Sequence, residues 1–513
     1  MKLSKLTFAI ATVLTASVAT SAFAMDLYVD TKTKQIYAEP GKGRHKLGTF
    51  EKVDENATHP SQRGISSDST QHLYQEVEAS KAEIKKVQTD LELKQNEIKA
   101  LEEHVVATRE GKQKNDEKWF NKINMRGYTQ FRYNQPLSGD REENSTDPEL
   151  TSPGDSKGLG NNKNFSIRRM RLVFSGDIND YMSIYIQPDF ATENGDQHFA
   201  QLRDAYTDLA FDKQHEYRIR AGISKIPFGW ENLQSSQNRL SLDRNDALNS
   251  ATPSERDMGL FAYWSPADTQ KLWKDLSKKG LKTSGDYGVV GMGIYNGQGL
   301  NKQELNDDFY YVAHSTYPME LGFLGSMFKG QVLEVGADAM IGKFNPTTKE
   351  FKPFKGVGGY NGKDAITPTI AGNTKGGIRE ERVGVHAILF PQPFGAQAEW
   401  NWGEQGTLNL ANKTIESQNL NGGYVQIMYK IDKLFRSDDT LIPFVKWQTY
   451  DGAWKAAANS PRVNVEELDV GFEYQIMKPV ELVVTYTNMD RTNVNNLGQA
   501  SGDMIRTQLQ WNY

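Results

Sequence analysis

Arginines recur at alternate positions in segments of the chain where polar and apolar residues alternate as they do in β-strands. Arg169 and Arg171 form one such pair, and Arg218 and Arg220 form another. Guanidinium groups bind the oxygens of phosphate and carboxylate through paired, charge-assisted hydrogen bonds. Neighbouring strands lie about 4.8 Å apart. The two pairs can therefore line one wall, and such a wall would attract small anions.

The face opposite the first pair is apolar, with Met170, Leu172 and Phe174. On a strand that crosses a membrane, an arginine turned toward lipid costs roughly 2–4 kcal/mol near the bilayer midplane. The pattern therefore predicts that the paired arginines face a water-filled lumen and that the apolar residues face lipid. Arg168 has the parity of the apolar face. We expect it to lie near a membrane interface and to extend its guanidinium group toward water.

The chain begins with the pattern of a secretory signal peptide. Lys2 and Lys5 precede an apolar run that ends at Ala22-Phe23-Ala24, so residues 1–24 are expected to be removed on export. The mean hydropathy is -0.64, and no later window has the roughly 20 apolar residues of a transmembrane helix. An exported soluble protein and a β-barrel remain as classes. The chain has 0 cysteines, which excludes a disulfide framework, and its net charge of -5 indicates no particular partner.

From residue 119 onward, polarity alternates with period two between polar, glycine-rich gaps. The predicted strands are 120–133, 165–176, 181–191, 200–211, 217–226, 258–265, 286–295, 308–316, 330–342, 380–390, 395–403, 421–431, 440–450, 465–476, 479–489 and 502–513. Long gaps after odd-numbered strands are 134–164, 227–257, 343–379 and 404–420. Long loops on one side and tight turns on the other are typical of transmembrane barrels. The chain is thus predicted to be all-β, with a 16-stranded antiparallel transmembrane β-barrel over residues 119–513.

Three further features of this region bear on the barrel. The last strand alternates to an aromatic C-terminus at Tyr513, as terminal strands of Gram-negative outer-membrane barrels do. The gap 266–285 is long on the side of the tight turns and is expected to hold a short amphipathic helix. Both faces of the segment around Arg203 and Asp204 are polar, so these two residues have no predicted orientation.

The expected luminal charges differ between the two halves of the barrel. Further luminal cations are Arg126, Arg132, Arg382, Lys446 and Arg506, and the acids of the later strands are Glu334, Asp338, Glu399, Glu467, Asp469 and Glu473. Arginine is therefore concentrated on the early strands and carboxylate on the later ones.

The region before the barrel has a different character. Residues 25–69 form a polar segment in which LYVD and QIYA can pair as a small hairpin. Residues 70–110 carry apolar residues at unbroken 4-3 spacing among Glu and Lys, which predicts a periplasmic coiled coil. A lone solvated helix is the alternative.

The order of several segments resembles a known family. These segments are FSIRRMRLVFSGDI, QLRDAYTDL, YRIRAGISKIPFGWENL, SERDMGLFAYW and YNGQG. They are similar to the recurrent segments of the phosphate-selective porin O and P family of Gram-negative outer membranes. The resemblance implies a homotrimer of sixteen-stranded barrels whose third external loop, here 227–257, folds into the lumen. Relatives with an N-terminal coil favour dicarboxylates, so phosphate, pyrophosphate and dicarboxylates are all candidate solutes.

The resemblance also implies an anion path. The residues carried over to it are Arg169, Arg171, Arg218, Arg220 and Lys225, with Arg239, Arg244 and Arg256 on the loop. Alternatively, these arginines pair with carboxylates in a nonselective general porin.

Other classes of function find less support in the sequence. The coil favours a structural tether of the envelope as one rival. An enzyme is not expected, because the 8 histidines are scattered and His386 reads as a lone polar residue of the wall. No cofactor and no metal are expected. Nucleic-acid binding is unsupported because the cations lie on strands rather than beside an aromatic platform.

Overall fold

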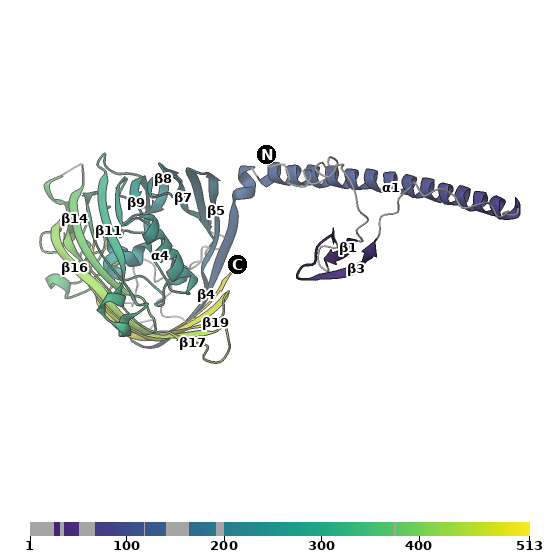
Figure 1. Ribbon diagram of the computed structural model, residues 1–513. Helices are drawn as coiled ribbons and strands as arrows, with labels where there is room; N and C mark the ends of the chain where they lie inside the picture. Colours follow the sequence, from purple (N-terminus) through teal and green to yellow (C-terminus); the bar gives the residue numbers. More distant parts are fainter. Residues whose placement is uncertain are drawn as a thin grey trace. The chain divides into compact units, whose positions relative to one another are not determined.

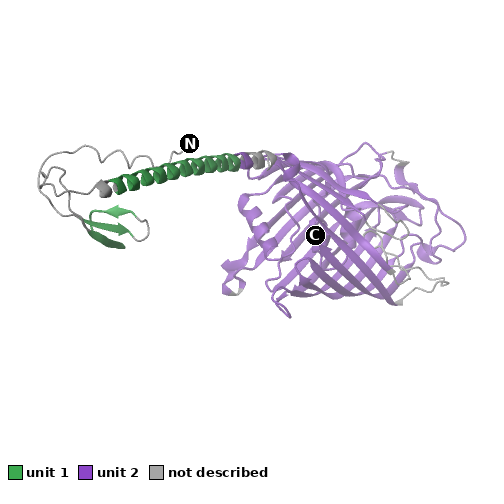
Figure 2. Ribbon diagram, turned by 90° about the vertical axis from the view of Figure 1, so that its right-hand side faces the viewer, with its two compact units in different colours: residues 1–106 green, residues 107–513 purple. Residues whose placement is uncertain are grey.

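The computed structural model describes residues 25–30, 35–50, 67–116, 118–139, 164–190, 200–373 and 376–513. The chain divides into two compact units, residues 1–106 and residues 107–513, coloured green and purple in Figure 2. The predicted signal peptide, residues 1–24, lies outside the described residues.

The first unit contains a small sheet. Strand β1 (Met25–Asp30) lies between β2 (Ile36–Tyr37) and β3 (Arg44–Phe50). Tyr28 pairs with Tyr37, which confirms the hairpin predicted from LYVD and QIYA. The third strand was not predicted.

Helix α1 (Ser67–Asp116) covers the predicted coil. In a single copy of the chain, the apolar residues at 4-3 spacing are exposed to water: Ile84 is 59%, Leu91 58% and Ile98 56% exposed. None of the described helices is both long and apolar enough to cross a membrane. The structure therefore confirms a helix here, and the coiled coil stays a prediction.

The second unit is a closed antiparallel barrel of 16 strands, seen as a ring of arrows in Figure 1. The strands are β4 (Asn124–Gly139), β5 (Asn164–Asn179), β6 (Met182–Asp189), β7 (Gln201–Ala210), β8 (Tyr217–Lys225), β9 (Arg256–Trp264), β10 (Val290–Tyr295), β11 (Tyr310–Glu320), β12 (Val332–Phe344), β14 (Ile378–Leu389), β15 (Phe394–Asn409), β16 (Thr414–Tyr429), β18 (Thr440–Ala453), β19 (Arg462–Met477), β20 (Val480–Thr492) and β21 (Gln499–Asn512). Every strand predicted from the sequence is confirmed. The pairing of β21 with β4 closes the ring.

Short elements accompany the barrel. The two-residue strands β13 (Thr369–Ile370) and β17 (Ile431–Asp432) pair beside the main strands. Single 3-10 turns are η1 (Trp119–Lys122), η3 (Leu321–Leu324), η4 (Ser326–Phe328), η5 (Val357–Gly359) and η6 (Ala371–Asn373).

The barrel has two different ends. At the end where β4 begins and β21 finishes, called the terminal mouth below, consecutive strands are mostly joined by tight turns, such as the one between Asn179 and Met182. Long connections lie at the other end, called the loop mouth. The predicted long gap 404–420 is wrong, because β15 and β16 continue to a tight turn in which Asn409 pairs with Thr414. Polar side chains on both strands masked this extension in the sequence.

On most strands, polar side chains face the lumen and apolar side chains face outward, although apolar wall residues such as Phe261 and Ile388 also lie inside, packed against the inner loop and the strap. On β19, Glu467, Asp469 and Glu473 are buried, whereas the alternating Leu468 and Val470 are exposed on the outer surface. The same holds for β5, where Arg169 and Arg171 are buried and Met170 is exposed. The orientation predicted from the cost of placing arginine in lipid is therefore confirmed.

The expectation for Arg168 is wrong. Gln130 pairs with Arg169 and Phe131 pairs with Ile167, so Arg168 is the extra residue of a β-bulge. The bulge turns Arg168 inward beside Arg169, and it is buried at 6% exposure. A second bulge on β7 skips Arg203, because Gln187 pairs with Asp204 and Pro188 pairs with Leu202. Arg203 and Asp204 are therefore both luminal.

This bulge leads to a test, and the absence of native cysteine makes single-cysteine labelling clean. In Arg168→Cys, we expect a charged, membrane-impermeant thiol reagent to reduce the open-channel current, because the new side chain faces the lumen. In Met170→Cys, which faces lipid, the same reagent should leave the current unchanged. Planar-bilayer recording before and after the reagent measures both. No block in either variant would show that strand β5 lacks the bulge, because residue 168 would then share the outward parity of Met170.

Candidate functional site

The connection between β8 and β9, residues 226–255, folds into the lumen and is called the inner loop. It contains α2 (Trp230–Leu233), η2 (Ser236–Asn238) and α3 (Asp246–Ala251). Its side chains are buried almost throughout, including Trp230 at 0% exposure. The loop 227–257 expected from the family resemblance therefore occupies the lumen.

Acidic residues of the inner loop contact basic residues of the far wall. Asp243 accepts from Arg132 at 3.3 Å and also from Arg506. Asp246 pairs with Arg491, and Glu231 accepts from the amine of Lys446 at 2.5 Å. Because removing one partner of a buried ion pair costs about 3–5 kcal/mol, these three contacts hold the loop across the lumen. In all three contacts the acid belongs to the loop and the cation to the wall.

The electrostatics of Asp243 follow from these neighbours. Burial opposes its ionisation, but the charges of Arg132 and Arg506 outweigh burial and hold the pKa of this loop carboxyl well below its usual range. A carboxyl whose pKa is lower in the folded than in the unfolded protein stabilises the fold fully at pH values above its pKa in the unfolded chain. This stabilisation is lost as the pH falls through its pKa in the folded protein. The Asp243 anchor therefore persists at neutral and mildly acidic pH.

The basic residues of the inner loop are held within the loop region. Arg239 pairs with Glu255. Arg244 donates to Asn249 at 2.7 Å and to Thr252 at 3.2 Å. Both guanidinium groups therefore stabilise the fold of the loop itself.

A second segment enters the lumen from the terminal mouth. It is the connection between β9 and β10, residues 265–289, and is called the strap. It contains α4 (Ala267–Lys278), the amphipathic helix predicted in the gap 266–285, which lies inside the ring of strands in Figure 1. Trp273 and Leu276 of α4 pack with Trp230 of the inner loop and with Ile388 of the wall.

The tip of the strap reaches the opposite wall. The amine of Lys282 pairs with Glu473 on β19 and with Glu481 on β20, the latter at 2.9 Å. In the ring, these strands lie opposite β9 and β10, from which the strap starts. The backbone carbonyl of Lys282 also accepts from Gln234 of the inner loop at 3.1 Å. The strap and the inner loop therefore cross the lumen together.

Two luminal cavities lie against the strap and the inner loop. The larger one, called the arginine cavity, has a volume of about 810 Å³ and lies against β6, β7 and β8. Its charged lining is Arg126, Arg220, Lys225, Arg256, Asp204 and Asp286. Four cations against two carboxylates leave an excess of two positive charges.

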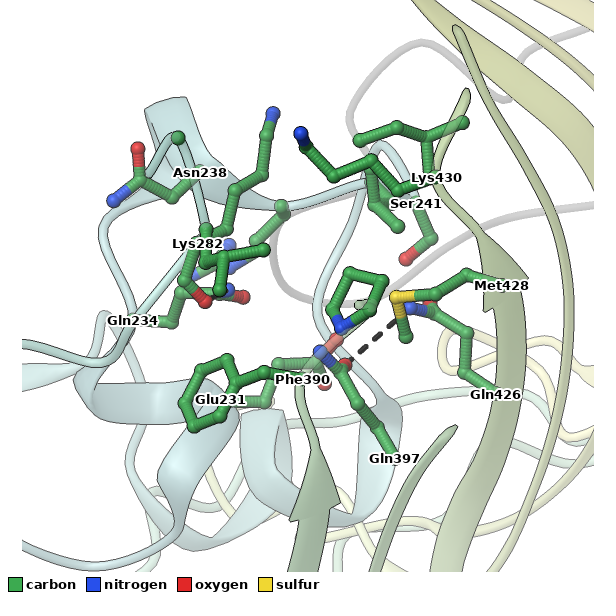
Figure 3. Close-up of a pocket in the computed structure, with 16 residues that line it drawn as sticks. Glu231, Gln234, Asn238, Ser241, Lys282, Phe390, Gln397, Gln426, Met428 and Lys430 are labelled. Carbon is green, nitrogen blue, oxygen red and sulfur yellow. Dashed lines mark hydrogen bonds between the residues drawn. The ribbon is translucent and has the colours of Figure 1, made fainter. Parts of the chain in front are cut away.

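The smaller cavity lies on the side of β15 to β18 and has a volume of about 440 Å³. Figure 3 shows Gln234 and Lys282 on one side of it and Gln426 and Met428 of the wall on the other. Gln426 donates to Gln397 at 3.3 Å across its floor. This cavity is mainly lined by uncharged side chains.

The structure brings three of the eight predicted anion-path residues to the arginine cavity, namely Arg220, Lys225 and Arg256. The others lie in neighbouring networks. Carboxylate partners are Asp189 for Arg171, Asp286 for Arg218, Asp208 for Arg220, Glu255 for Arg239 and Asp204 for Arg256. Arg169 donates to Gln130 at 3.0 Å. Most of these guanidinium groups are therefore already held by protein acceptors.

Lys225 has a different environment. Its amine donates to the backbone carbonyls of Asn232, Leu233 and Gln234 at 2.8, 3.3 and 2.7 Å. These acceptors are neutral, and no carboxylate among the described residues forms a direct ion pair with this amine, although the charge of Glu255 acts on it from nearby. Lys225 thus both fixes the start of the inner loop and contributes charge to the arginine cavity.

Arg126 was not among the predicted site residues, although its strand parity pointed to the lumen. It lines the arginine cavity, is exposed, and has no hydrogen bond or ion pair with any residue that the structure describes. A guanidinium group in this state has all of its donors free for a solute. Arg126 lies an even number of residues from Arg132 on the same strand, and this spacing was the signal that could have identified it as a luminal site residue.

The expectation that His386 is a lone polar residue of the wall is wrong. Ligand atoms of Asp338, His386 and Glu399 all lie within 4.8 Å of one another, and all three residues are buried. They come from three neighbouring strands, so their spacing in the sequence carries no signal of the grouping. Among the described residues, these are the side chains that could hold a metal ion.

A family model described as phosphate-selective porin O and P matches residues 147–513. The sequence comparison with curated proteins gave no significant match. Among solved structures, the chain is similar to the outer-membrane channel DcaP of Acinetobacter baumannii, with 13% identity, coverage of 76% of this chain and 97% of that chain, and a TM-score of 0.43. It is similar to Salmonella typhi OmpF in complex with daunomycin, with 13% identity, coverage of 76% and 97%, and a TM-score of 0.43. The trimer form of Vibrio cholerae OmpT has 10% identity, coverage of 76% and 99%, and a TM-score of 0.41.

Proposed function

Since this chain belongs to the phosphate-selective porin O and P family and forms an outer-membrane channel, we propose that it passes small anionic solutes by passive diffusion. The single observation that carries the proposal is the excess of positive charge in the arginine cavity. The family and fold indicate a channel rather than an enzyme. No covalent step is needed for this function.

The arginine cavity has the chemistry of an anion path. Arg126 offers free guanidinium donors at its edge, and Lys225 adds a charge with no direct acidic partner among the described residues. Arg220 and Arg256 keep part of their positive field although Asp208 and Asp204 hold their geometry. A solute would exchange between such groups without tight binding at any of them, as conduction requires.

The solute class follows from the donors. Guanidinium forks match the oxygens of phosphate, pyrophosphate and dicarboxylates equally well. We therefore propose that the channel accepts all three of these classes. Arg169, Arg171, Arg218, Arg239 and Arg244 support the path by holding the wall and the inner loop, rather than by contacting the solute.

The nonselective general porin remains a second candidate function because a specific observation favours it. Five of the eight predicted arginines and lysines have carboxylate partners. If the field of Arg126 and Lys225 were cancelled by more distant acids, small cations would pass as well. The envelope tether is compatible with either candidate.

We also propose how the chain is arranged in the envelope. The terminal mouth faces the periplasm, since the chain enters the barrel there. The helix α1 forms a periplasmic coiled coil with other copies, because its apolar seam is exposed in one copy. The barrel forms a homotrimer, as the family resemblance implies. The domain division is then a signal peptide 1–24, a polar segment 25–69, a coil 70–110 and the barrel 119–513.

The proposal is tested by the reversal potential of the purified channel in a salt gradient across a planar bilayer. We expect a preference for chloride over potassium. Addition of phosphate, pyrophosphate or a dicarboxylate should reduce the chloride current in a saturable way, because these anions compete for the same guanidinium groups. A reversal potential at zero, with no reduction of the current by any of the three, would assign the chain to the nonselective porins.

A further inference from the structure

Three luminal carboxylates on neighbouring strands lack the partners that other luminal acids have. Glu334, Asp338 and Glu399 are buried at 0%, 5% and 3% exposure, and none of them pairs with a lysine or arginine among the described residues. By contrast, the buried acids Asp189, Asp208 and Glu380 each pair with an arginine. A buried carboxylate without a cation is costly. A positive group bound in this part of the wall would therefore stabilise the three carboxylates.

Two histidines lie among these carboxylates because of the strand register. His314 on β11 pairs with Asp338 on β12, and His386 on β14 pairs with Glu399 on β15. Gly336 is the partner of His386 on β12. A Cβ atom at Gly336 would lie 2.3 Å from Nε2 of His386, so the glycine makes room for the ring. The ring consequently lies over β12, beside Asp338.

The hydrogen bonds fix the tautomer of His386. The hydroxyl of Thr316 has one proton, which it donates to Glu334 at 2.9 Å. The same hydroxyl oxygen lies 2.9 Å from Nε2 of His386, so Nε2–H is the donor in this contact. In the neutral ring, the other nitrogen, Nδ1, then carries a lone pair rather than a proton.

This lone pair points at a carboxylate oxygen. Nδ1 of His386 and Oδ2 of Asp338 are 3.5 Å apart, and neither atom has a hydrogen-bond partner. Two electron-rich atoms facing each other in a buried site repel unless a positive centre lies between them. Zinc–nitrogen and zinc–oxygen bonds of about 2.0–2.1 Å at a tetrahedral angle put two ligand atoms about 3.4 Å apart. The observed separation of 3.5 Å therefore matches one edge of a tetrahedral coordination shell.

Glu399 completes the group. Its two oxygens accept from the backbone N–H groups of Trp230 and Glu231 at 2.6 and 3.0 Å. Each carboxylate oxygen has a second lone pair that remains for a metal ion. Oδ1 of Asp338 contacts Nδ1 of His314, which orients the carboxylate in the way that outer partners orient metal ligands.

We propose that Asp338, His386 and Glu399 bind one divalent transition-metal ion of the zinc class within the wall of the lumen. Imidazole with two carboxylates suits zinc and its neighbours, whereas calcium and magnesium prefer oxygen ligands alone. Three protein ligands leave the fourth position to water. The ion neutralises two buried carboxylates. It also fixes the start of the inner loop, because Glu399 holds the amides of Trp230 and Glu231.

The test uses purified full-length protein in detergent, depleted of metal with a chelator and then dialysed. Titration with Zn²⁺ should give one high-affinity site per chain, and Co²⁺ should give the visible absorption of a tetrahedral nitrogen–oxygen site. His386→Gln and Asp338→Asn should weaken binding by more than about 100-fold, since loss of outer partners alone costs roughly 10–100-fold. His215→Gln, which changes a half-buried histidine in the turn between β7 and β8, away from the site, is the matched control and should bind as the wild type does.

Thermal unfolding provides a readout that does not depend on a variant. Zn²⁺ should raise the melting temperature of the wild-type protein, and Ca²⁺ at the same concentration should not, because binding to the native state alone stabilises it. A wild-type protein that takes up no Zn²⁺ or Co²⁺ would overturn the proposal. Uptake that is equal in the wild type and in folded His386→Gln would overturn it as well. The channel function could stand in either case, because ion selectivity is measured separately.

Discussion

Reversing one charge, in the variant Arg126→Glu, is expected to lower the ratio of anion to cation permeability by more than tenfold. An anion that passes about 5 Å from a unit charge in water gains about 0.8 kcal/mol. The reversal removes one cation and adds one carboxylate, so the interaction energy of the passing anion changes by about 1.7 kcal/mol. A difference of about 1.4 kcal/mol corresponds to a factor of ten. The excess of two positive charges in the lining would become zero.

Arg126 is suited to this test because it is exposed and has no partner among the described residues. Its replacement breaks no ion pair, so the fold should be unaffected. The reversal potential in a salt gradient measures the ratio at low and high ionic strength, and the difference from wild type should shrink at high salt. Arg379→Glu is the matched control, since Arg379 pairs with Glu381 at an exposed site near the loop mouth. An unchanged ratio in Arg126→Glu would contradict the anion path at this cavity.

Removing the strap is expected to raise the single-channel conductance several-fold. Trp264 of β9 pairs with Val290 of β10, so residues 266–287 can be replaced by a short polar turn without changing the register. The replacement would remove α4 and Lys282, which cross the lumen to Glu473 and Glu481. It would also remove Trp273 and Leu276 from their cluster, and each large-to-small loss in a core costs about 2–5 kcal/mol.

Single-channel recording and thermal unfolding measure the two effects of strap removal. Lys282→Met is the milder variant, which frees the tip of the strap and should produce larger current fluctuations rather than a fixed larger pore. Lys278→Met is the control, because Lys278 is exposed on α4 and pairs with Asp275 on the same helix. A strapless protein that is folded but keeps the wild-type conductance would mean that solutes pass beside the strap.

Much of the fold could be predicted from alternation of polarity. Arg169 and Arg171 are turned inward and Met170 outward, as the cost of arginine in lipid requires. Local patterns also predicted the final strand, the number of barrel strands and the helix in the gap 266–285. Each of these features depends on residues that are near neighbours in the chain.

The errors arose where pairing between strands sets the geometry. Arg168, which was predicted on the wrong face, and Arg203, for which no orientation was predicted, are extra residues in bulges, and a bulge depends on the register of the partner strand. The strand extension at 404–420 depends in the same way on the pairing of β15 with β16. Alternation in a single strand cannot show where such an extra residue lies.

The contents of the lumen were also beyond reach of local patterns. Lys282 meets Glu473, and His386 meets Asp338, across distances in the chain that carry no spacing rule. Arg126 pairs with no carboxylate among the residues that the structure describes, whereas Arg220 is bound to Asp208. The functional state of an arginine thus depends on what lies opposite it.

The sequence by itself determined the number of strands, the sidedness of most strands and the family, because these depend on alternation and on short segments along the chain. The tertiary structure alone decided which luminal charges are paired, which cations are available to a solute, and where two carboxylates and an imidazole meet. The physical reason is that sidedness is set by the solvent on each face of one strand, whereas pairing is set by the register and closure of the whole ring.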